Sequence, residues 1–185
     1  RKDIGGSIDL LGLERALFEF GGTLETPRVF PKKPKKVAVI GAGISGLTVS
    51  YDLVRKGYQV VVFEKEPTLG GILNSIDHHI LSVNTISNDF EILKSLKVDL
   101  RTSSDVKNIT RDDQNNFIVQ EESFDTVYLG IGENGTLPEP ILIDSDHIVD
   151  PVTFQTSIPG VFAGGSLVRS VPVKIDHGKY LLSHS

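Results

Sequence analysis

Residues 36–64 read KVAVIGAGISGLTVSYDLVRKGYQVVVFE. The unbroken apolar run at 37–40 predicts a buried strand of the kind found in parallel sheets. A helix is expected from about Ser45 to Lys56, where Gly57 is suited to end it. A second strand is expected over residues 59–64. Strand, helix and strand form one βαβ unit, whose crossover we expect to be right-handed, so the sequence predicts an α/β fold with a central parallel sheet.

The turn between the first strand and the helix carries three glycines, and the second strand ends in an acid. Gly41, Gly43 and Gly46 follow the pattern G-x-G-x-x-G, and Glu64 stands 18 positions after Gly46. Such glycines allow a tight turn, a close approach of the backbone to a pyrophosphate, and close packing of the helix on the strand. The helix N-terminus attracts phosphate, and a carboxylate can accept both ribose hydroxyls. The pattern predicts a Rossmann-like site for NAD or FAD rather than NADP, and the competing interpretation is a plain turn with a solvent-facing Glu64.

Two further segments favour FAD over NAD. Gly70 and Gly71 follow shortly after the acid, as in the FAD-binding domains of flavoproteins that bind two dinucleotides. Residues 150–166, DPVTFQTSIPGVFAGGS, resemble the segment that returns to the flavin in the same proteins. Ser166 stands where that resemblance implies an Asp that holds the ribityl chain, so a reduced affinity for flavin is expected.

The chain resembles the FAD-binding domain of glutamate synthase small-subunit-like oxidoreductases, a family that includes the flavin half of dihydropyrimidine dehydrogenase. Residues 8–20, IDLLGLERALFEF, are similar to the segment that precedes the FAD domain in this family, and the likeness is most specific at 37–73 and 150–166. The resemblance implies FAD as the cofactor. It implies cofactor contacts at Gly41, Ala42, Gly43, Ile44, Ser45, Gly46, Glu64, Lys65, Gly70, Gly71, Leu73, Val106, Gly130, Gly132, Gly165 and Ser166.

One departure from the family concerns its second nucleotide site. Full members carry an NAD(P)H-binding domain between the segments that correspond to Gly132 and Asp150, where this chain has only 17 residues. A βαβ unit needs about 30 or more. Residues 130–135, GIGENG, repeat the glycine pattern, but Pro138 and Pro140 follow and prevent a helix. Electrons are therefore expected to come from a redox partner or another part of the same protein, either iron–sulfur or nicotinamide-binding, or from a small donor.

The composition limits the classes of protein to which the chain could belong. The chain has 185 residues, a net charge of −5 and an ordinary globular composition, which disfavours nucleic-acid binding. It has no apolar run long enough for a membrane helix and no visible signal peptide, so a cytoplasmic protein is expected. It has no cysteine, and the histidine spacing suggests no metal site. The absence of methionine suggests a fragment of a longer protein.

Three segments are expected: an N-terminal helical segment at 1–30, a linker at 31–36 and an FAD-binding domain at 37–185. In the first, Ser7 is the expected cap of a helix that ends at Phe20. Weaker patterns predict a small additional β layer. They indicate a helix at 89–96, strands at 98–101, 117–120, 123–129, 141–143, 147–149 and 161–163, and a last helix at 173–182.

The leading functional hypothesis is an FAD-dependent oxidoreductase domain within a larger redox protein. No acid–base residue is indicated, so the catalytic residues stay unassigned. The alternative is a non-catalytic or vestigial FAD-binding subunit, which Ser166 and the short 133–149 connection favour. An NAD-dependent dehydrogenase is the third hypothesis, and Gly70 and Gly71 disfavour it.

Overall fold

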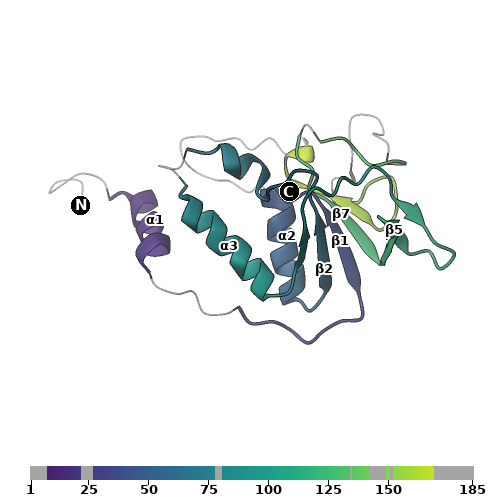
Figure 1. Cartoon of the computed structure of the whole chain (residues 1–185), viewed down its shortest axis with the longest axis horizontal. Coiled ribbons are helices and arrows are strands. Elements are labelled where there is room, and N and C mark those ends of the chain that lie inside the picture. The colour runs from purple at the N-terminus through teal and green to yellow at the C-terminus, as the bar shows by residue number, and fades with distance from the viewer. Residues whose placement is uncertain are drawn as a thin grey trace.

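A five-stranded parallel sheet forms the centre of the protein (Figure 1). The computed structural model describes residues 8–21, 27–77, 81–133, 135–141, 149–150 and 152–168. The strand order is β3-β2-β1-β7-β8, and every neighbouring pair is parallel. The strands are β1 (Lys36–Ile40), β2 (Gln59–Phe63), β3 (Asp99–Arg101), β7 (Thr126–Leu129) and β8 (Val161–Ala163). The order reverses between β1 and β7, and ligands of open α/β sheets bind at such a switch point, beside the carboxyl ends of the strands.

Two helices cover one face of this sheet. These are α2 (Ile44–Arg55) and α3 (Val83–Ser95), which lie on the same side in Figure 1. Alternate residues of β1 and β2 face them, because successive side chains of a strand point to opposite faces. The resulting core comprises Val37, Val39, Val60 and Val62 from the strands and Leu47, Val54, Leu93 and Leu96 from the helical side.

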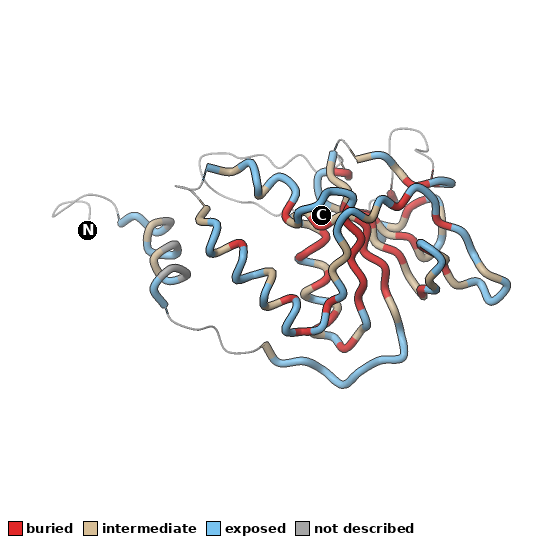
Figure 2. Tube along the Cα trace, in the orientation of Figure 1, coloured by how far each residue is buried: buried red, intermediate tan, exposed pale blue. Residues whose placement is uncertain are grey.

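The opposite face carries the expected additional β layer. It is an antiparallel sheet of β4 (Thr110–Arg111), β5 (Phe117–Val119) and β6 (Glu122–Phe124). The other alternating set of β1 and β2 residues packs there against aromatic side chains, with Phe63 and Phe124 edge to face at 5.8 Å. Buried residues accordingly gather in the strands of the central sheet (Figure 2). The predicted α/β class, with a parallel sheet and a small β layer, is confirmed.

The N-terminal helix α1 (Leu10–Phe20) ends where the sequence predicted, but its cap differs. Asp9 caps the helix, because its carboxylate accepts a hydrogen bond from the Gly12 backbone at 2.9 Å. The prediction of Ser7 as the cap is therefore wrong. No helix in the described ranges is both long and apolar enough to cross a membrane.

Other element boundaries depart from the sequence predictions. The helix expected at 89–96 begins at Val83, with Ser82 as its cap. The strand expected at 123–129 is two strands, because the chain leaves one sheet for the other at Asp125. Ile141 belongs to no strand, Val149 forms only an isolated bridge, and residues 142–148 and the expected helix at 173–182 lie outside the described residues. No helix follows the glycine pattern at 130–135 among its described positions, as the prolines predicted.

Candidate functional site: a crevice at the carboxyl edge of the sheet

The turn after β1 can be formed only with glycine at two positions. Gly41 has φ = 97°, and a Cβ there would stand 2.5 Å from the carbonyl oxygen of Gly130. A Cβ at Gly46 would stand 1.9 Å from the carbonyl oxygen of Gly41. Side chains would therefore push α2 and β7 away from the turn. The glycines hold the first turn of α2 directly against the ends of β1 and β7.

The N-terminus of α2 has no side-chain cap. Gly43 is the N-cap residue, and no described side chain makes a capping hydrogen bond to the N–H groups of the first turn. The Leu47 backbone donates to the carbonyl of Gly43 at 3.0 Å, which starts the bonding within the helix. A Cβ at Gly43 would meet nothing nearer than 3.9 Å, so the space in front of the helix is open. Uncapped N–H groups, a positive helix end and open space together suit a phosphate group.

Glu64, at the end of β2, is tied to this turn. The residue is only 7% exposed, which contradicts the interpretation of a solvent-facing acid. Oε2 accepts a hydrogen bond from the Ala42 backbone at 2.7 Å, and Oε1 accepts one from the Glu66 backbone at 3.0 Å. Each carboxylate oxygen can accept a further bond. The carboxylate is thus fixed beside the glycine turn with acceptor capacity left for the hydroxyls of a ribose.

The second glycine pair bonds to the same turn. The Gly70 backbone donates to the carbonyl of Ala42 at 2.8 Å. A Cβ at Gly71 would lie 3.3 Å from the Cα of Gly43. The N–H of Ala42 donates to Glu64, and the carbonyl of Ala42 accepts from Gly70. Ala42 therefore links the acid to the second glycine pair. Parts of the chain predicted separately from sequence therefore form one continuous wall.

The end of β8 approaches α2 from the other side. A Cβ at Gly165 would stand 2.7 Å from the Cβ of Ser45. The hydroxyl of Ser45 lies 2.6 Å from that of Tyr128 on β7. That side chain is therefore bonded to β7, and the Ser45 backbone N–H is available for a phosphate. Sequence reasoning missed Tyr128; the available signal was a hydroxyl at the end of a side chain in the apolar run TVYL.

The remaining predicted contacts are distributed around this wall. Ile44 is exposed on the first turn of α2, and Lys65 is exposed after β2. Leu73 is half-buried in the short helix η1 (Gly71–Ser75), and Ser166 is exposed in η2 (Gly165–Leu167). The role of these residues in binding a ligand stays a prediction.

Two predicted contacts differ in what surrounds them. Gly132 has φ = 77° and no atom within 4 Å of a Cβ placed there, so it borders open space. Val106 instead has its side chain in the core between the two sheets, which leaves only its backbone for a ligand.

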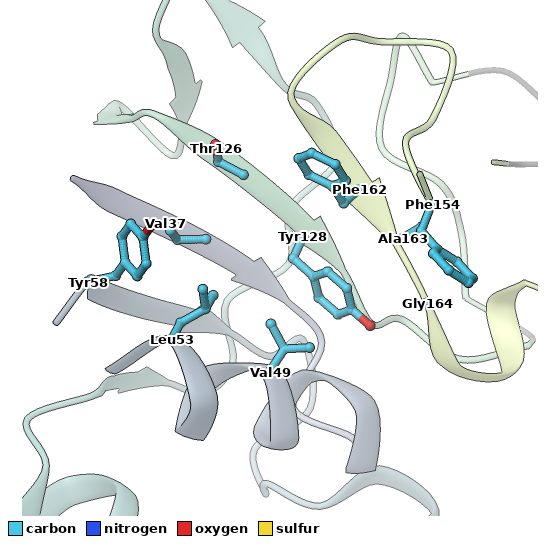
Figure 3. Close-up of a pocket in the computed structure, with 10 residues that line it drawn as sticks. All are labelled: Val37, Val49, Leu53, Tyr58, Thr126, Tyr128, Phe154, Phe162, Ala163 and Gly164. Carbon is cyan, nitrogen blue, oxygen red and sulfur yellow. The ribbon is translucent and has the colours of Figure 1, made fainter. Parts of the chain in front are cut away.

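An apolar groove of about 570 Å³ lies beside the crevice (Figure 3). Val49 and Leu53 of α2 face Tyr128 and Phe162 across it. Among the described residues that line the groove there is no helix N-terminus and no carboxylate. Its chemistry suits apolar contacts and not a nucleotide, so the crevice remains the candidate site.

The fold and the crevice define a Rossmann-like dinucleotide-binding domain. The family model described as an NAD(P)-binding Rossmann-like domain matches residues 39–93, which include the glycine turn, Glu64 and most of α3.

Similarity to known proteins extends further along the chain. The putative oxidoreductase UacF of Escherichia coli is 31% identical over 163 residues, which cover 84% of this chain and 24% of the relative. The small chain of the NADPH-dependent glutamate synthase of E. coli is 30% identical over 132 residues, 69% of this chain and 27% of the relative. Among solved structures, the HOCl-induced flavoprotein disulfide reductase RclA of E. coli has a TM-score of 0.44 at 18% identity, covering 81% of this chain and 38% of that one.

Over most of its length the chain is similar to oxidoreductases of the glutamate synthase small-chain kind. It spans about a quarter of the length of the two curated relatives.

Proposed function

We propose that this chain is an FAD-binding oxidoreductase domain that passes electrons through its flavin within a larger redox protein or complex. The observation that carries the proposal is the convergence of three features on one edge of the sheet. These features are the uncapped N-terminus of α2, the fixed carboxylate of Glu64 and the glycine-rich end of β8. Together they suit a ligand with a pyrophosphate, a ribose and a further group on the far side of the pyrophosphate.

Each part of the crevice suits one part of the cofactor. The backbone N–H groups at the start of α2 would bind the pyrophosphate. Glu64 would accept hydrogen bonds from the adenosine ribose, and its charge would repel a 2′-phosphate. Gly165 and Ser166 would border the flavin end. When bound, the flavin supplies the redox chemistry, and the protein supplies binding, orientation and electrostatics.

Support for FAD over NAD comes from two segments of the chain. Gly70 and Gly71 extend the crevice wall beyond the ribose-binding acid, which a simple NAD site does not need. Residues 150–166 resemble the flavin-side segment of two-dinucleotide-binding flavoproteins. The electron donor and acceptor would be a partner protein or another part of the same protein, iron–sulfur or nicotinamide-binding. The small chain of glutamate synthase, by its name, is one subunit of an assembly.

The test is a titration of the purified 185-residue chain with FAD, followed by absorbance and by quenching of flavin fluorescence. We expect FAD to bind, NADP⁺ to compete poorly, and Glu64→Ala to weaken FAD binding by at least roughly tenfold, because a charged acceptor is lost. Glu66→Ala is the matched control, since that side chain is exposed and should leave affinity unchanged. If the alanine variant unfolds, Glu64→Gln replaces it, because glutamine removes the charge and keeps the size of the side chain. Equal FAD affinity in the wild type and in folded Glu64 variants would refute the proposal.

A second candidate is a subunit that holds flavin without turnover or no longer holds it. The serine at 166, where the resemblance implies an aspartate, favours it. Photoreduction of the FAD-loaded chain, followed by reoxidation with an artificial acceptor, separates the two. Reversible bleaching supports the redox role, whereas failure to bind FAD at all supports the vestigial role. Ser166→Asp should raise FAD affinity, because a carboxylate is the stronger acceptor for a ribityl hydroxyl.

A further inference from the structure

Basic residues gather along the edge of the sheet opposite the crevice. Residues 28–36 read RVFPKKPKK and lead into β1, and Arg55 and Lys56 lie at the end of α2. We refer to residues 28–36 with Arg55 and Lys56 as the basic strip. It holds seven of the 19 Lys and Arg residues of a chain whose net charge is −5. Such a separation of charge within an acidic chain marks a candidate interaction surface.

Backbone hydrogen bonds fix the basic strip to the domain. The Phe30 backbone donates to the carbonyl of Arg55 at 2.7 Å, and the Lys33 backbone donates to the carbonyl of Gly57 at 2.8 Å. Between these two bonds, the carbonyl oxygen of Pro31 would lie 2.1 Å from a Cβ at Gly57, so glycine is needed there. The segment is extended and ordered before any partner arrives, which lowers the entropic cost of binding.

Most of the positive charge has no carboxylate partner within the described chain. Lys35 pairs with Asp125 at 2.6 Å, and Lys36 pairs with Glu122. The structure records no ion pair to a described carboxylate for the other five cations, which are Arg28, Lys32, Lys33, Arg55 and Lys56.

Two of the five cations rest on aromatic rings instead. The Nζ of Lys33 lies 4.4 Å from the ring centroid of Tyr58, and the guanidinium of Arg55 lies 5.2 Å from that of Tyr51. A ring orients a cation without cancelling its charge.

Two apolar side chains lie among these cations. Val29 is 46% exposed and Phe30 is 61% exposed. Aromatic and Arg side chains are enriched in protein–protein interfaces, and a buried aromatic commonly anchors such an interface. The mixture therefore suits an acidic protein surface with an apolar recess better than it suits a purely anionic polymer.

The basic strip lies at the opposite edge of the sheet from the crevice. Lys36 begins β1, and the glycine turn of the crevice follows the last residue of that strand. Five residues of strand span about 17 Å. Figure 1 shows the chain reaching β1 along the edge from which the strands start, away from the start of α2. A partner docked on the basic strip would leave the crevice open.

We propose that the basic strip is the docking surface for an acidic face of the redox partner. The proposal rests on the proposed function in one respect, namely that this domain exchanges electrons with another protein or domain. It adds the chemistry of that partner: carboxylates arranged around an apolar side-chain pocket. Opposite charge also speeds diffusional encounter, so docking should weaken and slow as salt rises.

The probe is a fluorescent peptide rich in Glu and Leu, added to the full 185-residue chain at low ionic strength and followed by anisotropy. The triple variant Lys32→Glu, Lys33→Glu, Arg55→Glu should weaken peptide binding by at least roughly tenfold. Lys107→Glu, with the same change of side chain at an exposed site in the loop after β3, should have little effect. Phe30→Ala, which keeps every charge, should also weaken the peptide. Peptide affinity equal in all variants would overturn the proposal.

Competing anions separate this proposal from other polyanion surfaces and from the cofactor site. An oligonucleotide or phosphatidylserine vesicles that bind more tightly than the peptide, with the same dependence on the basic strip and none on Phe30, would overturn the protein-docking assignment. Glu64→Ala should leave peptide binding intact. The triple variant should leave FAD binding intact. If the wild-type chain does not bind FAD but still binds the peptide through the basic strip, the proposed function is wrong. If the chain binds FAD but its peptide binding does not depend on the basic strip, the docking proposal is wrong.

Discussion

The hydroxyl of Ser45, on the first turn of α2, lies 2.6 Å from the hydroxyl of Tyr128 on β7. A Cβ at Gly164 would stand 2.4 Å from that Tyr128 hydroxyl, so the end of β8 packs directly on the pair. The bond joins α2 to β7, and the packing of β8 on it brings together the two sides of the crevice: the helix end suited to a pyrophosphate and the strand end that borders the flavin in the proposed function. Neither side chain needs to touch the ligand for the pair to set the width of the crevice.

Tyr128→Phe removes this bond and keeps the ring in the groove wall. We expect the free energy of unfolding to fall by about 1 kcal/mol, the usual net contribution of one hydrogen bond. Urea denaturation measures it. Tyr58→Phe is the control, because within the described ranges the Tyr58 hydroxyl makes only a 3.4 Å exposed contact with Lys33. An unchanged midpoint for Tyr128→Phe would mean that the two hydroxyls do not hold the helix to the strand.

Gly46→Ala and Gly132→Ala separate a packing glycine from one that borders open space. At Gly46 a Cβ meets backbone at 1.9 Å, so we expect a loss of about 3 kcal/mol or more in unfolding free energy. At Gly132 a Cβ meets no atom within 4 Å, so the unfolding free energy should fall only by the strain of the positive φ, about 1 kcal/mol. If a ligand occupies the open space, Gly132→Ala should also weaken FAD binding. Thermal unfolding with and without FAD reports both effects, and equal stability losses would contradict the packing argument.

Glu122 should make stability depend on pH. The hydrogen bond from Lys36 lowers the pKa of Glu122 below its usual 4.5, and Arg101, 2.8 Å away, lowers it further against the opposing effect of partial burial. A lowered folded-state pKa gives stability that is fully present above the unfolded-state pKa and lost as the pH falls through the folded-state pKa.

Glu122→Gln should therefore be less stable than the wild type near neutral pH, and the difference should close below about pH 4. Urea midpoints at several pH values measure it. Glu91→Gln, which breaks the exposed pair with Lys94, should change stability little at any pH. A Glu122→Gln deficit that is constant with pH would show that charge is not the cause.

Gly57→Ala tests how firmly the segment before β1 is attached. A Cβ there collides with the carbonyl of Pro31, and the φ of 90° is unfavourable for alanine. We expect faster hydrogen exchange at the Lys33 amide, together with a loss of about 2 kcal/mol in stability. Unchanged protection of that amide would mean that the segment adapts without detaching.

Long-range contacts explain which parts of the fold the sequence could predict. The runs at 37–40 and 60–63 are continuous and apolar, and Val161–Ala163 has the same character, so β1, β2 and β8 follow from local pattern. The break at Asp125 does not, because its carboxylate is satisfied by the Lys36 backbone at 2.7 Å and by Lys35, about 90 positions earlier. The residues in the first turns of α3 are mostly polar or β-branched, so the sequence pattern did not predict that the helix begins at Val83.

Some parts of the crevice could likewise be predicted from the sequence and others could not. The glycine motif and Glu64 carry a local signature because backbone geometry demands those residue types. The carboxylate bond to Ala42, the hydroxyl of Tyr128 and the closeness of Gly165 to Ser45 join segments between 22 and about 120 positions apart. Such contacts depend on strand order, which single-sequence patterns do not contain.

The double attachment of Ala42, to Glu64 on one side and Gly70 on the other, bears on kinetics. A ribose pocket whose acid is already oriented needs no reorganisation when a nucleotide arrives. In the proposed function, capture should then proceed at the rate set by diffusion and orientation, and differences in affinity between ligands should lie mainly in the rate of dissociation.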